Sequence, residues 1–239
     1  MNHPGPAGSL WSPRGRVVVF FLAATSLGCL LADFYGICSM RVFALGVFAP
    51  AMVTLGVVSL FDRRRNDGRL AQAVRIGTIA GLLAAAAYDL FRLPFVFAKQ
   101  WGLTPVVPAL NLFKVFPAFG AMLLGEPIQQ ASYSPAASWL GWLYHFSNGA
   151  TIGVMYLALV GDGWARHWAW AVLLAMGLEL GMLFTPYPRV FGIPLTMRFV
   201  LVTLAAHAVF GAGLGLGVRA MWRGSMNTPG SEGVQVRAV

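Results

Sequence analysis

The sequence predicts an all-α protein, a polytopic transmembrane helical bundle of about six spans with one additional re-entrant or interfacial helix. Of its 239 residues, 58% are hydrophobic and only 10% are charged, and the mean hydropathy is +0.69. Soluble domains carry about 25% charged residues. The apolar residues gather in stretches of about 20, the length at which a helix crosses the hydrocarbon core of a bilayer. This composition excludes a soluble globular enzyme, a disordered chain and a disulfide-rich scaffold.

The first two spans are predicted at 17–38 and 42–61, and both have arginine-rich flanks. The polar tail 1–16 carries two arginines close to the first span, and the loop 62–69 carries four. Cytoplasmic loops of membrane proteins collect arginine and lysine. We therefore expect the N-terminal tail and the loop 62–69 to lie on the cytoplasmic side.

The third span is predicted at 73–98, and a proline-interrupted segment follows it. The span is rich in alanine and glycine, small residues that let neighbouring helices approach closely. The next apolar segment, 108–125, contains Lys114 and Pro117 and is short for a clean crossing. We interpret it as a re-entrant or interfacial helix on the outer side. The alternative is a full crossing, which would reverse the orientation of everything that follows.

The last three spans are predicted at 137–160, 168–186 and 194–218. Arginines follow the first and the last of these, which favours a cytoplasmic position for the loop between the first two and for the C-terminus. The spans form a single transmembrane domain, 17–223, and the polar residues 224–239 are expected to be a disordered tail.

The positions of the charges indicate which partners the protein binds, and the spacing of the cysteines indicates whether they form a redox or zinc site. The net charge of +9 comes from arginines and lysines near span ends, and no basic face is interleaved with aromatic residues, so nucleic acid is not an expected partner. The expected partner is the lipid bilayer, and other membrane subunits or a second copy in a homo-oligomer are further candidates. Cys29 and Cys38 lack the spacing of a redox or zinc motif and are interpreted as small apolar fillers.

Seven polar or ionisable side chains fall inside the predicted spans and form the candidate binding site. Such groups cost several kcal/mol in lipid unless they are paired or hydrated, so each is a functional hypothesis by default. The candidates are Asp89, Arg92, His145, Asn148, Glu179, Arg198 and His207. A helical rise of about 1.5 Å per residue, counted from the span ends, places most of them in the outer half of the bilayer, with Asn148 and His207 deeper. We therefore expect two sites, or two ends of one path.

Spacing and depth predict two ion pairs among these residues. Asp89 and Arg92 are three residues apart on one helix face, so they can pair within their own span. Glu179 has no partner at that spacing, and Arg198 on the next span lies at a similar depth, so we expect Glu179 and Arg198 to pair. Without that pair, Glu179 is expected to be protonated.

Each of the two histidines heads a row of glycines. Gly149 follows His145 by four residues and Gly211 follows His207 by four, and the same spacing continues to a second glycine in each span. Residues four apart share a helix face. Both faces are therefore expected to pack closely against another helix.

No cofactor is predicted, and two alternatives remain open. A haem held by His145 and His207 needs both axial ligands at one depth, whereas the predicted depths of these residues differ by roughly 8–12 Å. A metal site of His145, Glu179 and Asp89 has suitable depths and the carboxylate–imidazole chemistry of zinc or iron, but no clustered ligand motif supports it.

Several features of residues 73–218 occur in an order known from one family. In this order they are Arg75-Ile76-Gly77 opening the Ala/Gly-rich span, a proline-broken segment, a His-led helix through Gly153 to Tyr156, a span ending in Thr185-Pro186, and a last span with His207 and then Arg219. The order resembles that of the YagU-like inner-membrane proteins, a family of unknown function linked to acid tolerance. The resemblance implies a bacterial cytoplasmic membrane and proton-related physiology, and it supplies no catalytic residues.

Taken together, these features predict an integral membrane protein with a buried polar site in the outer half of the bilayer. The site would bind or pass a small solute or protons, or the protein would serve as an accessory membrane subunit. The alternative is a membrane enzyme or redox subunit acting on a lipid or a quinone, with His145 and Glu179 as acid/base groups or metal ligands.

Overall fold

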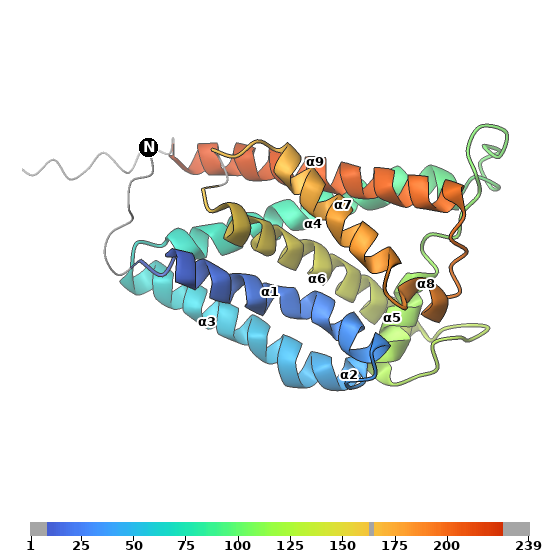
Figure 1. The fold of residues 1–239 in the computed structure, drawn as a ribbon, viewed down its shortest axis with the longest axis horizontal. Coiled ribbons are helices and arrows are strands. Elements are labelled where there is room, and N and C mark those ends of the chain that lie inside the picture. The colour runs from blue at the N-terminus through green and yellow to red at the C-terminus, as the bar shows by residue number, and fades with distance from the viewer. Residues whose placement is uncertain (1–8, 163–164, 227–239) are drawn as a thin grey trace, which may run out of the picture.

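The protein is an antiparallel helical bundle (Figure 1). The computed structural model describes residues 9–162 and 165–226, and no strand occurs among them. The α-helices are α1 (Pro13–Phe34), α2 (Met40–Phe43), α3 (Ala49–Arg65), α4 (Arg69–Val96), α5 (Val115–Leu124), α6 (Pro135–Val160), α7 (Ala169–Leu183), α8 (Tyr187–Val190) and α9 (Met197–Met226). The predicted all-α class is confirmed.

Serine–proline pairs set the start of two long helices. The Ser12 hydroxyl accepts a hydrogen bond from the Gly15 backbone N–H at the start of α1, and the Ser134 hydroxyl accepts one from Ala137 at the start of α6. Serine is a favoured N-cap, and proline fits the first helical position because its missing N–H has no intrahelical partner there. These caps explain why both helices begin before the apolar runs predicted at 17 and 137.

α2 and α3 form one helix that contains a single π-helical turn, Ala44–Phe48. Pro50 lies two residues after the end of this turn and lacks the N–H that a regular helix would use there. A π turn of this kind lets the chain continue as a helix past the missing donor. The predicted span 42–61 is therefore the central part of a longer helix that ends at Arg65.

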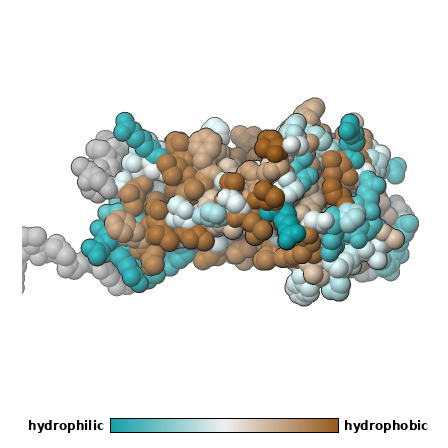
Figure 2. All heavy atoms as spheres, turned by 90° about the horizontal axis from the view of Figure 1, so that it is seen from below, coloured by the Kyte–Doolittle hydropathy of each residue, from teal (hydrophilic) through white to brown (hydrophobic). Residues whose placement is uncertain are grey.

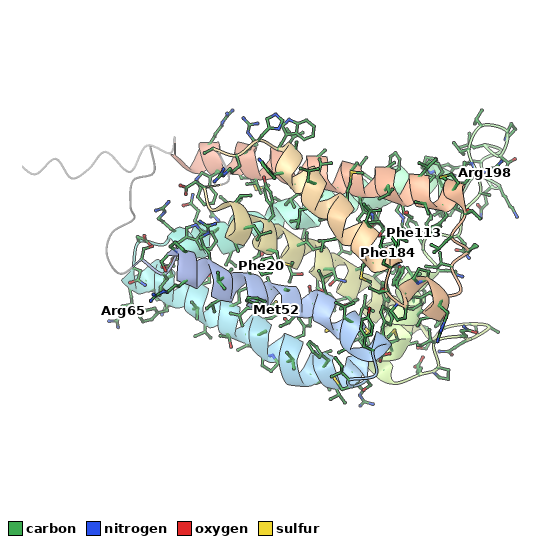
Figure 3. The ribbon with its side chains drawn as sticks, viewed as in Figure 1. Phe20, Met52, Arg65, Phe113, Phe184 and Arg198 are labelled. Atoms are coloured by element: carbon green, nitrogen blue, oxygen red, sulfur yellow. The ribbon has the colours of Figure 1, made fainter. Side chains whose placement is uncertain are left out.

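The chain runs back and forth between two ends of the bundle (Figure 1). One end, here called the arginine-rich end, holds the 62–69 loop, the start of α1, the α6–α7 connection and the end of α9. There the Arg69 guanidinium lies 2.8 Å from the Asp162 carboxylate. The other end, here called the loop end, holds the connections 97–114, 125–134 and 184–196. Arg65 and Arg198 lie at opposite ends (Figure 3).

Among the described residues, four helices are long and apolar enough to cross a membrane, and they are α1, the helix Met40–Arg65, α4 and the part Met197–Arg223 of α9. α6 has 26 residues, but polar side chains such as His145 and Asn148 lower its hydropathy. α7 has 15 residues and rises about 22 Å. Figure 2 shows a broad apolar surface between two polar ends. The structure thus supports a multi-pass membrane protein with four candidate spans, and it does not confirm the predicted count of six.

The predicted segment 108–125 is helical only at α5, which has ten residues. A helix of that length rises about 15 Å, half of the hydrocarbon core. The chain enters and leaves α5 at the loop end (Figure 1). α5 therefore does not cross the bundle.

The predicted tails differ from the observed helix ends. α1 begins at Pro13, inside the predicted tail 1–16, and residues 1–8 lie outside the described part of the chain. α9 continues to Met226, so residues 224–226 are helical rather than part of a disordered tail. The remainder of that predicted tail, 227–239, lies outside the described residues.

Close glycine contacts hold the long helices together. A Cβ atom added at Gly81 of α4 would lie 2.1 Å from the Gly149 carbonyl oxygen of α6, and one added at Gly153 would lie 2.0 Å from the Gly77 carbonyl oxygen. Only glycine fits at such distances, as in other membrane helix pairs. On the other side of the bundle, a Cβ added at Gly211 of α9 would lie 2.4 Å from a Cα atom of α7. The prediction of two closely packed glycine faces is confirmed.

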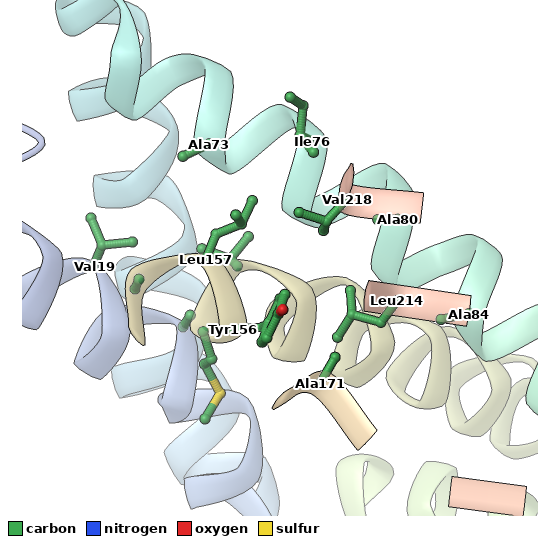
Figure 4. Packing of buried hydrophobic residues seen from close by; sticks show 14 of the residues in the cluster. Val19, Ala73, Ile76, Ala80, Ala84, Tyr156, Leu157, Ala171, Leu214 and Val218 are labelled. Carbon is green, nitrogen blue, oxygen red and sulfur yellow. The ribbon is translucent and has the colours of Figure 1, made fainter. Parts of the chain in front are cut away.

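The half of the bundle toward the arginine-rich end contains a core of buried apolar side chains, part of which Figure 4 shows. Tyr156, Leu157, Leu214 and Val218 are each at most 1% exposed and belong to one cluster with alanines of α4. Buried clusters of this kind contain few voids as large as a water molecule. An apolar core therefore lies on this side of the candidate site.

Candidate functional site

A cavity of about 150 Å³ lies in the half of the bundle toward the loop end. Five of the seven predicted site residues line it, and they are Arg92, His145, Asn148, Glu179 and His207. Helices α1, α4, α5, α6, α7 and α9 all contribute to its wall. A cavity of about this volume can hold several waters or one small molecule about the size of benzene.

Asp89 and His145 form the first polar contact at the cavity. The Asp89 carboxylate lies 2.9 Å from Nε2 of His145 and 3.4 Å from the Arg92 guanidinium. The predicted pair of Asp89 and Arg92 is confirmed. A carboxylate at Asp89 only accepts hydrogen bonds, so His145 donates to it through Nε2–H, which a neutral imidazole is able to do. With a neutral imidazole, this group of three carries no net charge.

Arg92 is 3% exposed and is held from several sides. Its guanidinium donates to the Leu112 carbonyl oxygen in the connection before α5. It also lies 4.7 Å from the ring centre of Tyr88 and 5.3 Å from that of Phe116, distances at which a cation is attracted to the ring face. The buried charge is therefore compensated by a carboxylate, a carbonyl and aromatic rings.

Glu179 and His207 form a second polar contact, between α7 and α9. The Glu179 carboxylate lies 3.5 Å from Nε2 of His207, and Nδ1 of His207 lies 2.9 Å from the Thr203 carbonyl oxygen. A carbonyl oxygen only accepts, so Nδ1 carries the hydrogen. Nε2 of a neutral His207 is then a lone pair facing a carboxylate. A favourable contact requires one additional proton, either on His207 or on Glu179.

The predicted pair of Glu179 and Arg198 is wrong. Arg198 is exposed at the loop end, and the ion-pair contact that the described residues give Glu179 is with His207. Arg198 and His207 are nine residues apart and lie on opposite faces of α9. When α9 packs its His207 face against α7, Arg198 is turned away from Glu179.

Of the two predicted arrangements, separate shallow and deep sites are wrong, whereas two ends of one path agree with a single cavity. Asn148 and His207 line the same cavity as His145 and Glu179. Depth was counted from predicted span ends, whereas α8 and the 191–196 connection form part of the loop end and α9 begins only at Met197. The residues therefore converge despite their different distances from the ends of the spans.

Tyr88 lies close to both histidines. Its ring centre is 5.8 Å from that of His145 and 4.9 Å from that of His207. The haem alternative stays a prediction.

Within residues 9–162 and 165–226, no group of three histidine, cysteine or acidic side chains is placed so that it could hold a metal ion. The metal alternative therefore has no matching geometry there. Asp89 contacts His145, while Glu179 contacts His207. The carboxylates and imidazoles are divided into two separate pairs.

A second cavity, of about 270 Å³, adjoins the first on the side of the loop end, and we call it the vestibule. It lies against the residues before α5 and against the start of α9, including Asn111, Lys114 and Thr196. Tyr88, Arg92, Val115, Glu179 and Tyr187 line both cavities. Glu179 therefore faces the vestibule as well as the inner cavity.

Sequence analysis missed several residues of the site. Tyr88 precedes Asp89 and lies one helical turn before Arg92, so its place on the polar face was a usable signal. Tyr187 belongs to α8, and burial raises the pKa of its phenol, which keeps it a hydrogen-bond donor. The Leu112 carbonyl and the ring of Phe116, which stacks on His145 at 4.3 Å, come from an irregular segment and a short helix. No sequence pattern indicated these two.

Comparisons with protein-family models, with curated proteins and with solved structures found no match. The resemblance to the YagU-like proteins therefore stays a prediction.

Proposed function

We propose that this protein is a six-span protein of a bacterial cytoplasmic membrane that takes up a small solute or protons from the outer side into its buried cavity. The observation that carries this proposal is the pair of adjoining cavities. They extend from the loop end to Glu179 and the two histidines, while the half toward the arginine-rich end holds a buried apolar core and a separate pocket between the start of α1 and the end of α6.

The course of the chain supports six crossings. α1, α3, α4, α6, α7 and α9 alternate in direction between the two ends, and α5 stays at one end (Figure 1). α6 is long enough to cross, and its polar residues face the cavity rather than lipid. α7 is short, a mismatch that membranes accommodate by local thinning at modest cost.

The distribution of arginines supports the orientation. The arginines at the arginine-rich end are Arg14, Arg16, Arg63, Arg64, Arg65, Arg69, Arg75, Arg166, Arg219 and Arg223. Fewer basic residues lie at the loop end, so the positive-inside rule puts the arginine-rich end and both chain termini in the cytoplasm. The vestibule then opens toward the outer side.

The test is the sidedness of single cysteines in a background of Cys29→Ala and Cys38→Ala. Asn111→Cys at the vestibule should react from outside intact cells with a membrane-impermeant maleimide. Asn66→Cys in the arginine-rich loop should react only after the membrane is permeabilised. The reverse pattern would overturn the orientation, and an unreactive Asn111→Cys in permeabilised cells would show that the vestibule is closed to water.

A further inference from the structure

The two histidine–carboxylate contacts differ in the number of protons they need. Asp89 and His145 are satisfied by a neutral imidazole, because His145 donates through Nε2–H. Glu179 and His207 need one additional proton, because the hydrogen of the imidazole is already committed to the Thr203 carbonyl. The second contact is therefore the place in the cavity where a proton can be gained or lost.

The charge around the cavity defines what can replace that proton. Arg92 and Asp89 cancel each other at 3.4 Å, and neutral His145 adds no charge. Once the proton leaves, Glu179 is a carboxylate at 9% exposure, facing a lone pair of His207. A buried charge without a partner is costly, so the site then favours a single positive charge beside Glu179.

The remaining wall of the cavity suits an organic cation. The side-chain amide oxygen of Asn148, Oδ1, is buried and has no hydrogen-bond partner, and Asn148 lines the cavity. The rings of Phe119, Tyr187 and Phe210 also line it, and the guanidinium of Arg92 lies over other rings. Ring faces and an acceptor oxygen beside a carboxylate are the usual contacts of alkylammonium groups.

We propose that Glu179 and His207 form an exchange site at which a small organic cation, an amine or a quaternary ammonium compound, binds in place of one proton. The proton leaves Nε2 of His207, or the Glu179 carboxyl group, for water in the vestibule, which Glu179 also lines. One positive charge enters and one leaves, so the charge of the site is unchanged. This inference rests on the proposed function and names the class of solute.

The groups that face this pair come from every neighbouring element. Tyr88, Asp89 and Arg92 belong to α4, His145 belongs to α6 and Tyr187 belongs to α8. Lys114 lines the vestibule, and its ammonium group donates to the Gly192 carbonyl oxygen at 2.9 Å. The Asp89 carboxylate contacts both Arg92 and His145, although Nε of Arg92 is buried without a hydrogen-bond partner, and the Tyr88 and Tyr187 phenols are neutral. The exchange is therefore assigned to Glu179 and His207.

The test uses the purified full-length protein in lipid nanodiscs, with choline and methylammonium as probes. Equilibrium dialysis should find one cation per chain, bound at least about tenfold more tightly than the uncharged alcohol in which carbon replaces the nitrogen of choline. An indicator dye in weak buffer should record a proton released on binding. Affinity should rise between pH about 5 and 8, by at most about tenfold per pH unit.

Two variants and two matched controls locate the exchange. Glu179→Gln should lower the affinity at least about tenfold and remove its pH dependence, and His207→Gln should keep cation binding but shift its pH dependence. Glu126→Gln and His167→Gln change the same residue types outside both cavities and should behave as the unchanged protein. Should Glu179→Gln fail to fold, the selectivity and proton release of the unchanged protein decide the question.

Several results would overturn the exchange while leaving the proposed function in place, because the sidedness of Asn111→Cys tests the latter separately. Three of these results concern selectivity: equal binding of choline and its uncharged analogue, displacement of choline by sodium ions at equal concentration, and preferential binding of acetate. The other two are no binding of either cation, and cation binding without proton release throughout the pH range.

Discussion

Gly81→Ala tests the close packing of α4 against α6 that positions the polar residues. The added Cβ would lie 2.1 Å from the Gly149 carbonyl oxygen and 3.1 Å from the Cα of Ala150. Ordinary contacts of a Cβ begin at about 3.4 Å, so one helix must move away by about 1 Å. The obstacle is backbone, which cannot rotate aside as a side chain can.

The expected cost of Gly81→Ala combines two opposing effects. Overpacking a tight interface typically costs about 1–3 kcal/mol. Alanine in place of glycine within a helix returns about 0.5–1 kcal/mol. Gly149 lies one turn from His145 in α6, so the displacement should also lengthen the 2.9 Å contact between His145 and Asp89. We expect a net loss of about 1–2 kcal/mol in the free energy of unfolding.

The matched control is Gly213→Ala, on the face of α9 that contacts α4. There the added Cβ would lie 3.5 Å from the Cα of Ala84, which is ordinary contact, so this variant should be as stable as the unchanged protein or slightly more stable. Unfolding of the detergent-purified proteins by a denaturing detergent, followed by circular dichroism, measures both. Equal stability of Gly81→Ala and Gly213→Ala would refute the packing argument.

Three further substitutions probe the network around the cavity in the same unfolding assay. Arg92→Met leaves the Asp89 carboxylate buried without its cation and should cost about 3–5 kcal/mol, so a change below about 1 kcal/mol would contradict the buried pair. Arg198→Gln should change stability by less than about 0.5 kcal/mol, because Arg198 is exposed, and a large loss would revive its pairing with Glu179. Thr151→Val removes the partner at 2.6 Å from the buried Ser26 hydroxyl and should cost about 1–3 kcal/mol, and an unchanged stability would show that Ser26 finds another partner.

The features that sequence analysis predicted depend on periodicity along one helix. The glycine rows after His145 and His207 and the pair of Asp89 and Arg92 need only the spacing of residues on a helix face. Such spacing does not depend on how the helices are arranged, and the structure confirms these predictions. The arginines of the 62–69 loop likewise indicate one end of the bundle.

The features that sequence analysis missed depend on the rotation of each helix about its axis and on irregular segments. Glu179 and Arg198 share a predicted depth, but depth does not state which face of α9 meets α7. The close contact of Gly211 with α7 decides this and brings His207, on the same face, to Glu179. The Leu112 carbonyl reaches Arg92 from a connection whose course has no periodic signal.

The most direct measurement of an inner cavity open to the outer side is the reactivity of Ile152→Cys, in the background without native cysteines. Ile152 lines the inner cavity, whereas Val154, two residues on, is 2% exposed in the packed core and provides the control Val154→Cys. A small charged methanethiosulfonate reagent is applied to right-side-out and to inside-out vesicles. We predict modification of Ile152→Cys in right-side-out vesicles alone and no reaction of Val154→Cys in either. Modification of Ile152→Cys from the cytoplasmic side, or no reaction from either side, would contradict the account.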